Sequence, residues 1–327
     1  MAKLDTSYMG LKLDNPLIVG SSGITSTLEV VKRCEDAGAG AVVLRSVFED
    51  EVRREYESAV RAHMRAGHME AFTYQQPDLI NLKGGQQYLE LVNEATSALA
   101  IPVIASINCF AARSWGQYAR DLEKAGAKAI EVNLHEFTAS AVRSAENVEG
   151  TYSEAVSAVV RNTKVPVAAK LPPYFTNVAQ MAFQMELDGA AGVVMFNRPF
   201  LPDFDIESIE LKGGVSLSQP GDYKTTLRWV SLLSSRLGLD ICASGGIHDG
   251  QAIIKQILAG ARAVQVVSAL YRMDLARIQE MLRTVAEWMD RHEFDTLADF
   301  RGKLAQPKTD LPHLLEKTQY SRLYMGL

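Results

Sequence analysis

Four segments of the chain repeat one pattern, in which a helix end and a glycine precede a short apolar run whose last residues are polar. The segments are EDAGAGAVVLRS from Glu35, EKAGAKAIEVNL from Glu123, ELDGAAGVVMFN from Glu186 and ILAGARAVQVVS from Ile257. Glycine commonly ends a helix, and a continuous apolar run is typical of a strand that is buried on both faces. The repeat therefore predicts four helix-to-strand transitions of the same kind.

Four further apolar runs lie between these segments and complete an alternating pattern. They are NPLIVGS from Asn15, IPVIASI from Ile101, VPVAAKL from Val165 and LDICASG from Leu239. The intervening stretches have helical periodicity, and capping-box motifs at Ser26–Glu29 and Thr151–Glu154 predict two helix starts. Eight strands alternating with eight helices predict a single-domain α/β fold, the parallel (β/α)8 or TIM barrel. An open doubly wound sheet is the alternative, because a local pattern does not fix the topology.

The connections between the predicted elements differ in length. Long loops follow the second, fourth and sixth strands, at residues 46–84, 135–150 and 197–222. Such loops at the catalytic face of a barrel usually cover a substrate. Within the first and last of these loops we expect a helix over residues 49–64 and a hairpin over residues 206–217, with its turn at Lys212–Gly214.

The chain is expected to form one domain with a tail. Residues 1–293 would form the barrel, and residues 294–327 are too few for a second domain. We expect this tail to pack on the barrel or on a partner subunit.

Composition narrows the class of ligand. A formal net charge of −5 without a run of like charge argues against a nucleic-acid surface. The N-terminus lacks the basic-then-apolar pattern of a secretion signal, and no apolar run approaches the ~20 residues of a membrane span. We therefore expect a cytoplasmic protein with a small-molecule substrate and no nucleic-acid or membrane partner. Cys34, Cys109 and Cys242 do not form a disulfide or zinc pattern, and His63 and His68 lack a third metal ligand.

The stretch from Asp240 to Leu270 has the features of a phosphate site. Gly245 and Gly246 stop one strand at a turn where the backbone can approach a ligand, and the next strand ends on Ser268. Two neighbouring strand ends would thus present backbone amides and a hydroxyl at one point. Many barrels bind phosphate after their seventh and eighth strands in this way.

Polar residues end several of the other predicted strands. They are Arg45 and Ser46, Asn133, Lys170 and Asn197. Two cations and two amides beside a phosphate site suit a phosphorylated heteroaromatic cofactor such as a flavin. Arg45 and Lys170 would stabilise the negative charge that a reduced flavin carries, which is a catalytic role. The alternative is that both cations only pair with Glu131 or other carboxylates in the barrel mouth.

Several of these motifs resemble those of the class 1 dihydroorotate dehydrogenases, particularly their fumarate-using branch. The most specific are VPVAAKLPPYF at residues 165–175, SGGI at residues 244–247 and VVSAL at residues 266–270. The sequences NPLI from Asn15, with Ser22-Gly23, and NL from Asn81, with Tyr88-Leu89, resemble the family's first strand and second loop. The resemblance implies a TIM barrel that carries FMN and oxidises dihydroorotate to orotate in pyrimidine biosynthesis. It also implies a homodimer, and it leaves the electron acceptor unidentified.

The resemblance assigns roles to individual residues. Ser22, Arg45, Ser46, Asn133, Lys170 and the backbone at Phe196 would hold the flavin ring and ribityl chain, and Gly245, Gly246, Val267 and Ser268 its phosphate. Asn133, Asn197, Arg198, Gln75 and Thr138 would contact the substrate, and Glu136 occupies the position of the catalytic base.

The chain departs from the family pattern mainly at the substrate positions. Arg45 replaces a lysine, and Asn133-Leu-His-Glu-Phe-Thr138 replaces Asn-Leu-Ser-Cys-Pro-Asn, in which the cysteine is the base. Gln75 replaces another asparagine and Arg198 a serine. An ionised Glu136 would repel a carboxylate substrate unless Arg198 or another cation intervened, so activity on dihydroorotate does not follow from the resemblance.

Glu136 is nevertheless the strongest candidate for the acid or base of the reaction, because an apolar flavin pocket raises the pKa of a carboxyl group. The alternatives are a solvated loop glutamate and a salt bridge to Arg198. His135 is expected to point away from Glu136 by strand alternation, and His248 to lie near a helix start.

Two other functions are compatible with the sequence. Lys170 at the end of a central strand, near a phosphate site, is also what a Schiff-base aldolase would use. The other function is that of a flavoprotein that acts only as a binding or electron-carrying subunit.

Overall fold

The computed structural model describes residues 2–48, 83–108, 112–136, 138–199, 201–213 and 217–317. Within them the barrel strands are β3 (Leu17–Val19), β4 (Ala41–Val43), β6 (Val103–Asn108), β7 (Ala129–Asn133), β8 (Val167–Leu171), β9 (Gly192–Met195), β12 (Asp240–Ser244) and β13 (Ala263–Val266). The other strands are β1 (Thr6–Tyr8), β2 (Leu11–Leu13), β5 (Val47–Phe48), β10 (Asp203–Asp205) and β11 (Glu210–Lys212). The main helices are α1 (Leu28–Asp36), α3 (Lys83–Ala98), α4 (Ala112–Lys124), α5 (Ala145–Asn162), α6 (Val178–Leu187), α7 (Tyr223–Leu233), α8 (Gly250–Ala259) and α10 (Arg277–Arg291).

The barrel strands pair in parallel in the order β4-β3-β13-β12-β9-β8-β7-β6, and β6 pairs with β4 to close the cylinder. The predicted TIM barrel is therefore confirmed, and the open doubly wound sheet is wrong, because β13 hydrogen-bonds β3 instead of forming an edge. All eight predicted strands lie where the apolar runs indicated them. Parallel strands buried on both faces have continuous apolar sequences, which explains why this pattern was readable.

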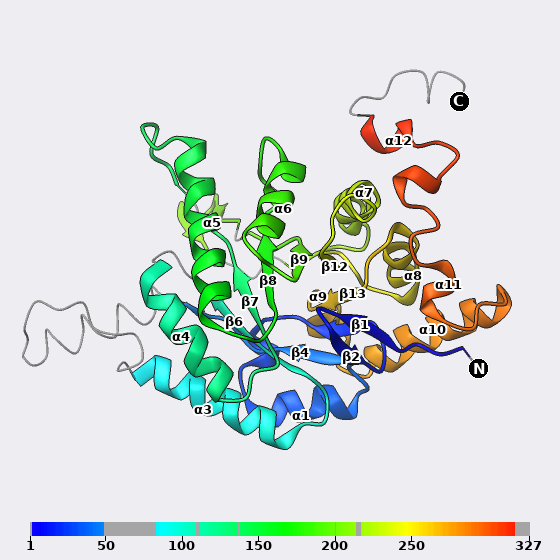
Figure 1. Ribbon diagram of the computed structural model, residues 1–327, viewed down its shortest axis with the longest axis horizontal. Coiled ribbons are helices and arrows are strands. Elements are labelled where there is room, and N and C mark those ends of the chain that lie inside the picture. The colour runs from blue at the N-terminus through cyan, green and yellow to red at the C-terminus, as the bar shows by residue number, and fades with distance from the viewer. Residues whose placement is uncertain are drawn as a thin grey trace, which may run out of the picture.

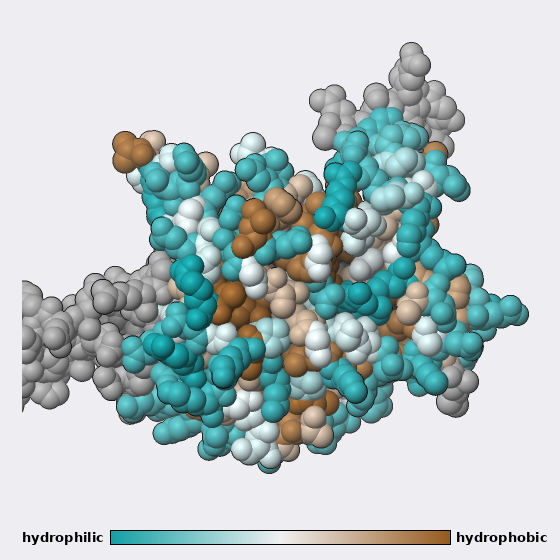
Figure 2. Space-filling model, viewed as in Figure 1, coloured by the Kyte–Doolittle hydropathy of each residue, from teal (hydrophilic) through white to brown (hydrophobic). Residues whose placement is uncertain are grey.

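The helices surround the barrel (Figure 1), with α3 to α6 on one side and α7, α8 and α10 on the other. Hydrophilic residues cover their outer faces, and hydrophobic residues are visible between neighbouring helices (Figure 2). After α10 the chain runs along α8 and α7 through two short helices, α11 (Leu297–Phe300) and α12 (His313–Glu316). Arg228 of α7 donates a hydrogen bond to the carbonyl of Leu315, which ties this segment to the barrel domain.

An N-terminal hairpin, β1–β2, closes one end of the barrel and was not predicted. Its turn contains Met9 and Gly10, both with positive φ, and the N–H of Met9 donates to Asp240 at 2.8 Å. The buried side chains of Tyr8 and Met9 pack inside the barrel, where a Cβ on Gly192 would lie 2.9 Å from Met9. The barrel interior is therefore filled at this end, and the large cavity at the site lies at the opposite, C-terminal end of the strands.

Three local expectations were wrong. The capping box at Ser26–Glu29 is absent, because Ser22 and Thr25 cap a 3-10 turn at Gly23–Thr25 instead. Thr151 lies inside α5, which begins at Ala145 with Ser144 as its cap. The hairpin β10–β11 lies a few residues earlier than expected.

The turn of that hairpin is built by Asp205, whose side chain accepts the N–H groups of Glu207 and Ser208. This aspartate turn chemistry competes well with a glycine turn. The helix expected over residues 49–64 falls outside the described residues.

Candidate functional site

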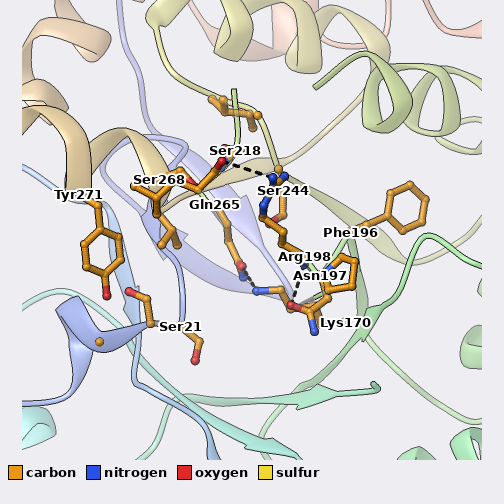
Figure 3. Close-up of a pocket in the computed structure, with 18 of the residues that line it drawn as sticks. Ser21, Lys170, Phe196, Asn197, Arg198, Ser218, Ser244, Gln265, Ser268 and Tyr271 are labelled. Atoms are coloured by element: carbon orange, nitrogen blue, oxygen red, sulfur yellow. Dashed lines mark hydrogen bonds between the residues drawn. The ribbon is translucent and has the colours of Figure 1, made fainter. Parts of the chain in front are cut away.

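A cavity of about 760 Å³ opens at the C-terminal ends of the barrel strands (Figure 3). A volume of this order fits the range of about 300–1,000 Å³ that is typical of cofactor and ligand sites. Its walls come from loops after β3, β8, β9, β12 and β13. Of the residues predicted to form the site, the cavity is lined by Ser22, Lys170, Phe196, Asn197, Arg198, Gly245, Gly246, Val267 and Ser268.

One wall of this cavity is an amide cradle, formed by Gly245, Gly246 and the start of α9 (Ser268–Met273). Both glycines have positive φ, +99° and +70°, and a Cβ on Gly246 would lie 2.2 Å from the backbone nitrogen of Tyr223. Within the described chain, neither glycine N–H has a hydrogen-bond acceptor. The hydroxyl of Ser268 accepts the N–H of Ser218 at 3.0 Å. Unpaired backbone N–H groups beside a hydroxyl form a site for an anion such as phosphate.

Lys170 forms the floor of the cavity within a buried polar network. Its Nζ lies 2.7 Å from Gln265 Oε1 and 3.3 Å from Glu131 Oε1, and Gln265 Nε2 donates to the other oxygen of Glu131. In Figure 3 the side chains of Lys170 and Gln265 meet at the centre of the site. The alternative pairing of Lys170 with Glu131 is thus present, although Lys170 also lines the cavity.

Gln265 was missed by the sequence interpretation. It is a polar residue on the inward phase of the apolar run AVQVV, and that departure from apolarity was the available signal.

Amides and hydroxyls from adjacent strand ends lie beside this floor. Asn197 Nδ2 donates to Asn133 Oδ1 at 2.8 Å, which joins two of the predicted amides. The hydroxyl of Ser46 is buried between those of Ser21 and Ser106, at 3.1 and 2.7 Å. Neither Asn133 nor Ser46 is among the residues that line the cavity, and both sit in the layer behind it.

The remaining wall is formed by Phe196 and the turn that Ser22 caps. The N–H of Phe196 donates to the carbonyl of Ser244 at 3.0 Å, which fixes the backbone that follows β9. In Figure 3 the ring of Phe196 points away from the other labelled side chains. Its contribution at this wall is therefore mainly backbone, as the resemblance implied.

The two predicted arginines lie at the mouth. Arg45 is exposed, outside the lining of the cavity, with its guanidinium 5.7 Å from the centre of the Phe48 ring. Arg198 lines the cavity and pairs with Asp222 at 3.1 Å, so the salt bridge considered between Arg198 and Glu136 is wrong. Gln75 lies outside the described residues, as do His63, His68 and Cys109.

Glu136 and Thr138 line a second cavity, of about 780 Å³, instead of the first. Pro199 lines both cavities, so they are neighbours. The carboxylate of Glu136 pairs with Arg143, and its backbone N–H donates to the hydroxyl of Tyr152 at 2.9 Å. The sequence interpretation overlooked Arg143, which stands seven positions further along the same loop.

His135 lines this second cavity together with Glu136, so the expectation that the two side chains face apart is wrong. Strand alternation does not apply to them, because β7 ends at Asn133. Burial lowers the pKa of His135, which favours its neutral form, and its Nδ1 is buried without a hydrogen-bond partner.

His248 precedes Asp249, the cap of α8, so its predicted place near a helix start is confirmed. Its Nε2 lies 2.9 Å from the hydroxyl of Ser218, and burial followed by Arg272 lowers its pKa. Across the described residues there is no group of three or more potential metal ligands. No helix in that part of the chain has the length and hydrophobicity to cross a membrane.

Comparison with known proteins finds dehydrogenases that align with most of this chain. The catalytic subunit of dihydroorotate dehydrogenase B (NAD(+)) from Thermoplasma volcanium is 29% identical over 317 residues, which cover 92% of this chain and 98% of the relative. Its namesake from Pyrococcus horikoshii is 28% identical over 306 residues, which cover 91% and 97%. The chloroplastic dihydropyrimidine dehydrogenase (NADP(+)) of Arabidopsis thaliana is 22% identical over 346 residues, which cover 96% and 80%.

The two archaeal relatives carry the NAD(+)-dependent name and not that of the fumarate-using branch. The predicted class of enzyme, an oxidoreductase acting on CH–CH groups, is confirmed. A model of the family described as dihydroorotate dehydrogenase matches residues 3–289, which is most of the barrel. This chain therefore belongs to the dihydroorotate dehydrogenase family.

Proposed function

We propose that the protein is an FMN-dependent oxidoreductase whose flavin occupies the 760 Å³ cavity. The observation that carries the proposal is that the amide cradle at Gly245 and Gly246 and the cation of Lys170 line the same cavity. A cradle for an anion and a buried cation within one cavity match a ligand that has a phosphate at one end and an electron-accepting ring at the other.

The residues present fit this cofactor. The free N–H groups of Gly245 and Gly246, together with Val267 and Ser268, would hold the phosphate. Lys170 would face the ring, supported by Asn133 and Ser46 from behind and by Ser22 and the Phe196 backbone at the sides. FMN, when bound, supplies the hydride acceptor of the reaction. Arg45, at the mouth, would act through its charge.

In this scheme Lys170 provides the buried positive charge beside the cofactor. Its Nζ lies 3.3 Å from Glu131 Oε1, and Gln265 fixes its position at 2.7 Å. A positive charge held rigidly under the cofactor would stabilise negative charge that develops on reduction. These contacts argue against a Schiff-base aldolase, because that chemistry needs an amine free to attack a carbonyl, and here Nζ is engaged by Glu131 and Gln265.

We propose Glu136 as the group that accepts the substrate proton. One of its carboxylate oxygens pairs with Arg143, while the other, Oε2, is buried without a partner. A carboxylate with one fixed and one free oxygen is held in place and still able to take a proton. Asn197, Arg198, Thr138 and Gln75 are proposed to contact the substrate.

The electron acceptor and assembly are further proposals. The relatives named as catalytic subunits suggest an electron-accepting partner subunit, whereas the resemblance implied a homodimer. Light scattering of the purified chain, alone and after co-expression with candidate partners, distinguishes these two assemblies.

The test of the proposed function is spectroscopic. Purified protein should show flavin absorbance, and anaerobic addition of a substrate should bleach it. Glu136→Gln should keep the bound flavin and lose the bleaching, because only the proton acceptor is removed. A colourless protein that does not take up FMN would refute the cofactor, and unchanged bleaching by Glu136→Gln would refute the base. Borohydride trapping of a carbonyl compound on Lys170 would support the aldolase instead.

A further inference from the structure

We infer that the 780 Å³ second cavity takes the substrate, and that this substrate is a ring with N–H donors and without a carboxylate. The inference rests on the proposed function only in treating the ligand as the substrate. The chemical class of the ligand is inferred from the residues that line the cavity.

The charge of the wall disfavours an anion. Two carboxylates, Glu136 and Glu149, line the cavity, and no lysine or arginine is among its lining residues in the described chain. Arg143 pairs with Glu136 from outside the lining, and Glu149 has no ion pair with another described residue. A ligand carboxylate would therefore meet like charge, which lowers its affinity.

The shape and polarity of the wall suit a ring. Tyr152 and Phe175 pack edge to face at 6.0 Å and 84°, and Tyr174 stands exposed at the rim. Pro172 and Pro199 also line the cavity and add apolar surface. Aromatic and proline side chains of this kind stack against planar ligands.

Two polar atoms in the wall lack partners. Glu136 Oε2 and His135 Nδ1 are both buried, and neither has a hydrogen bond within the structure. A buried acceptor left unpaired is costly, so a bound molecule that donates to it gains binding energy. Burial lowers the pKa of His135, and the unpaired nitrogen of its neutral ring can accept or donate a hydrogen bond according to its tautomer. The unpaired carboxylate oxygen of Glu136 is an acceptor, and it favours a ligand that donates an N–H group.

The cavity also has a route to the proposed cofactor. Asn197 and Arg198 line the first cavity, and the next residue, Pro199, lines both. A ring held against Glu136 would thus sit beside the flavin cavity. The predicted substrate contacts divide between the two cavities in the same way, with Thr138 in the second and Asn197 in the first.

The test compares two probes that differ only in the carboxylate, 5,6-dihydrouracil and dihydroorotate, by isothermal titration calorimetry with the full-length protein. We expect dihydrouracil to bind at least about tenfold more tightly. 5-Benzyl-5,6-dihydrouracil should bind more tightly again, because its phenyl group can occupy the surface at Tyr174 and Phe175. Glu136→Gln should weaken dihydrouracil binding and reduce its advantage over dihydroorotate.

Glu146→Gln is the matched control, because Glu146 lies in the first turn of α5, is exposed and does not line the cavity. It should leave both affinities unchanged. Equal or tighter binding of dihydroorotate, no binding of any probe, or the same effect from both variants would overturn the inference. A protein without flavin that still prefers dihydrouracil would refute the proposed function and leave the ligand class standing. A flavoprotein that prefers dihydroorotate would do the reverse.

Discussion

Replacing Lys170 by methionine should destabilise the fold strongly, because it leaves Glu131 charged and unpaired inside the barrel. The two side chains are 7% and 2% exposed and their charged atoms lie 3.3 Å apart. At an effective dielectric constant of about 20 this separation corresponds to an attraction of about 5 kcal/mol. Loss of one partner of a buried pair costs about 3–5 kcal/mol. We therefore expect Lys170→Met to lower the free energy of unfolding by about 3–5 kcal/mol.

The assay is urea unfolding of the flavin-free protein followed by far-ultraviolet circular dichroism, so that cofactor loss does not contribute. The double variant Lys170→Met with Glu131→Gln should recover most of the loss, since no uncompensated charge remains. Lys124→Met is the matched control, because Lys124 pairs with Asp121 at 2.9 Å but is 75% exposed. An exposed pair of this kind contributes only about 0–1 kcal/mol. A loss below about 1 kcal/mol for Lys170→Met, or no recovery in the double variant, would refute the reasoning.

Three further predictions concern other parts of the molecule. Gly246→Ala should lower the melting temperature more than Gly245→Ala: both positions have a positive φ, which strains an alanine, but a Cβ on Gly246 would lie 2.2 Å from the Tyr223 backbone, whereas a Cβ on Gly245 would lie 4.0 Å from Thr226 Oγ1. Equal melting temperatures would contradict this. Tyr8→Phe should raise the free energy of unfolding by about 1 kcal/mol in urea titrations, because the buried Tyr8 hydroxyl has no partner; destabilisation would contradict this. Burial lowers the pKa of His135, so the unfolded chain binds more protons there than the folded protein as the pH falls below about 6.5. As the pH falls from about 7 to about 5, the free energy of unfolding of His135→Gln should therefore decrease less than that of the wild type. Equal decreases would contradict this.

The barrel could be predicted from the sequence because its signals are local and repeated. Buried parallel strands such as β7 and β13 have apolar runs bounded by a helix end and a glycine, and the closure of eight such units follows from their number. The hairpin β1–β2 escaped because its strands have only three residues each. Period-two alternation over three residues does not differ from chance.

The residues proposed to hold the cofactor could be read from the sequence for a related reason. Gly245, Gly246 and Ser268 act through backbone position, and Lys170 through its phase on a strand, so the fold alone brings them together. Gln265, like Lys170, lies on the inward-facing side of its strand. It could have been found by asking which polar residues interrupt an apolar strand. Glu131 was considered as a partner of Lys170 because its position, too, is set by strand alternation.

The substrate half depends on which way loop side chains face, and no sequence period determines that. Glu136 lies three residues beyond the end of β7. Its orientation is fixed by Arg143 of the following loop, which pairs with its carboxylate, and by Tyr152 of α5, whose hydroxyl accepts its backbone N–H. A change in that loop can therefore redirect the carboxylate without disturbing the strands that carry Lys170. Among the described residues, Pro199 is the one that lines both the 760 Å³ and the 780 Å³ cavity. On the proposed function, the cavity at Lys170 would hold the hydride acceptor, and the charge and shape of the wall around Glu136 would decide which molecule is oxidised or reduced.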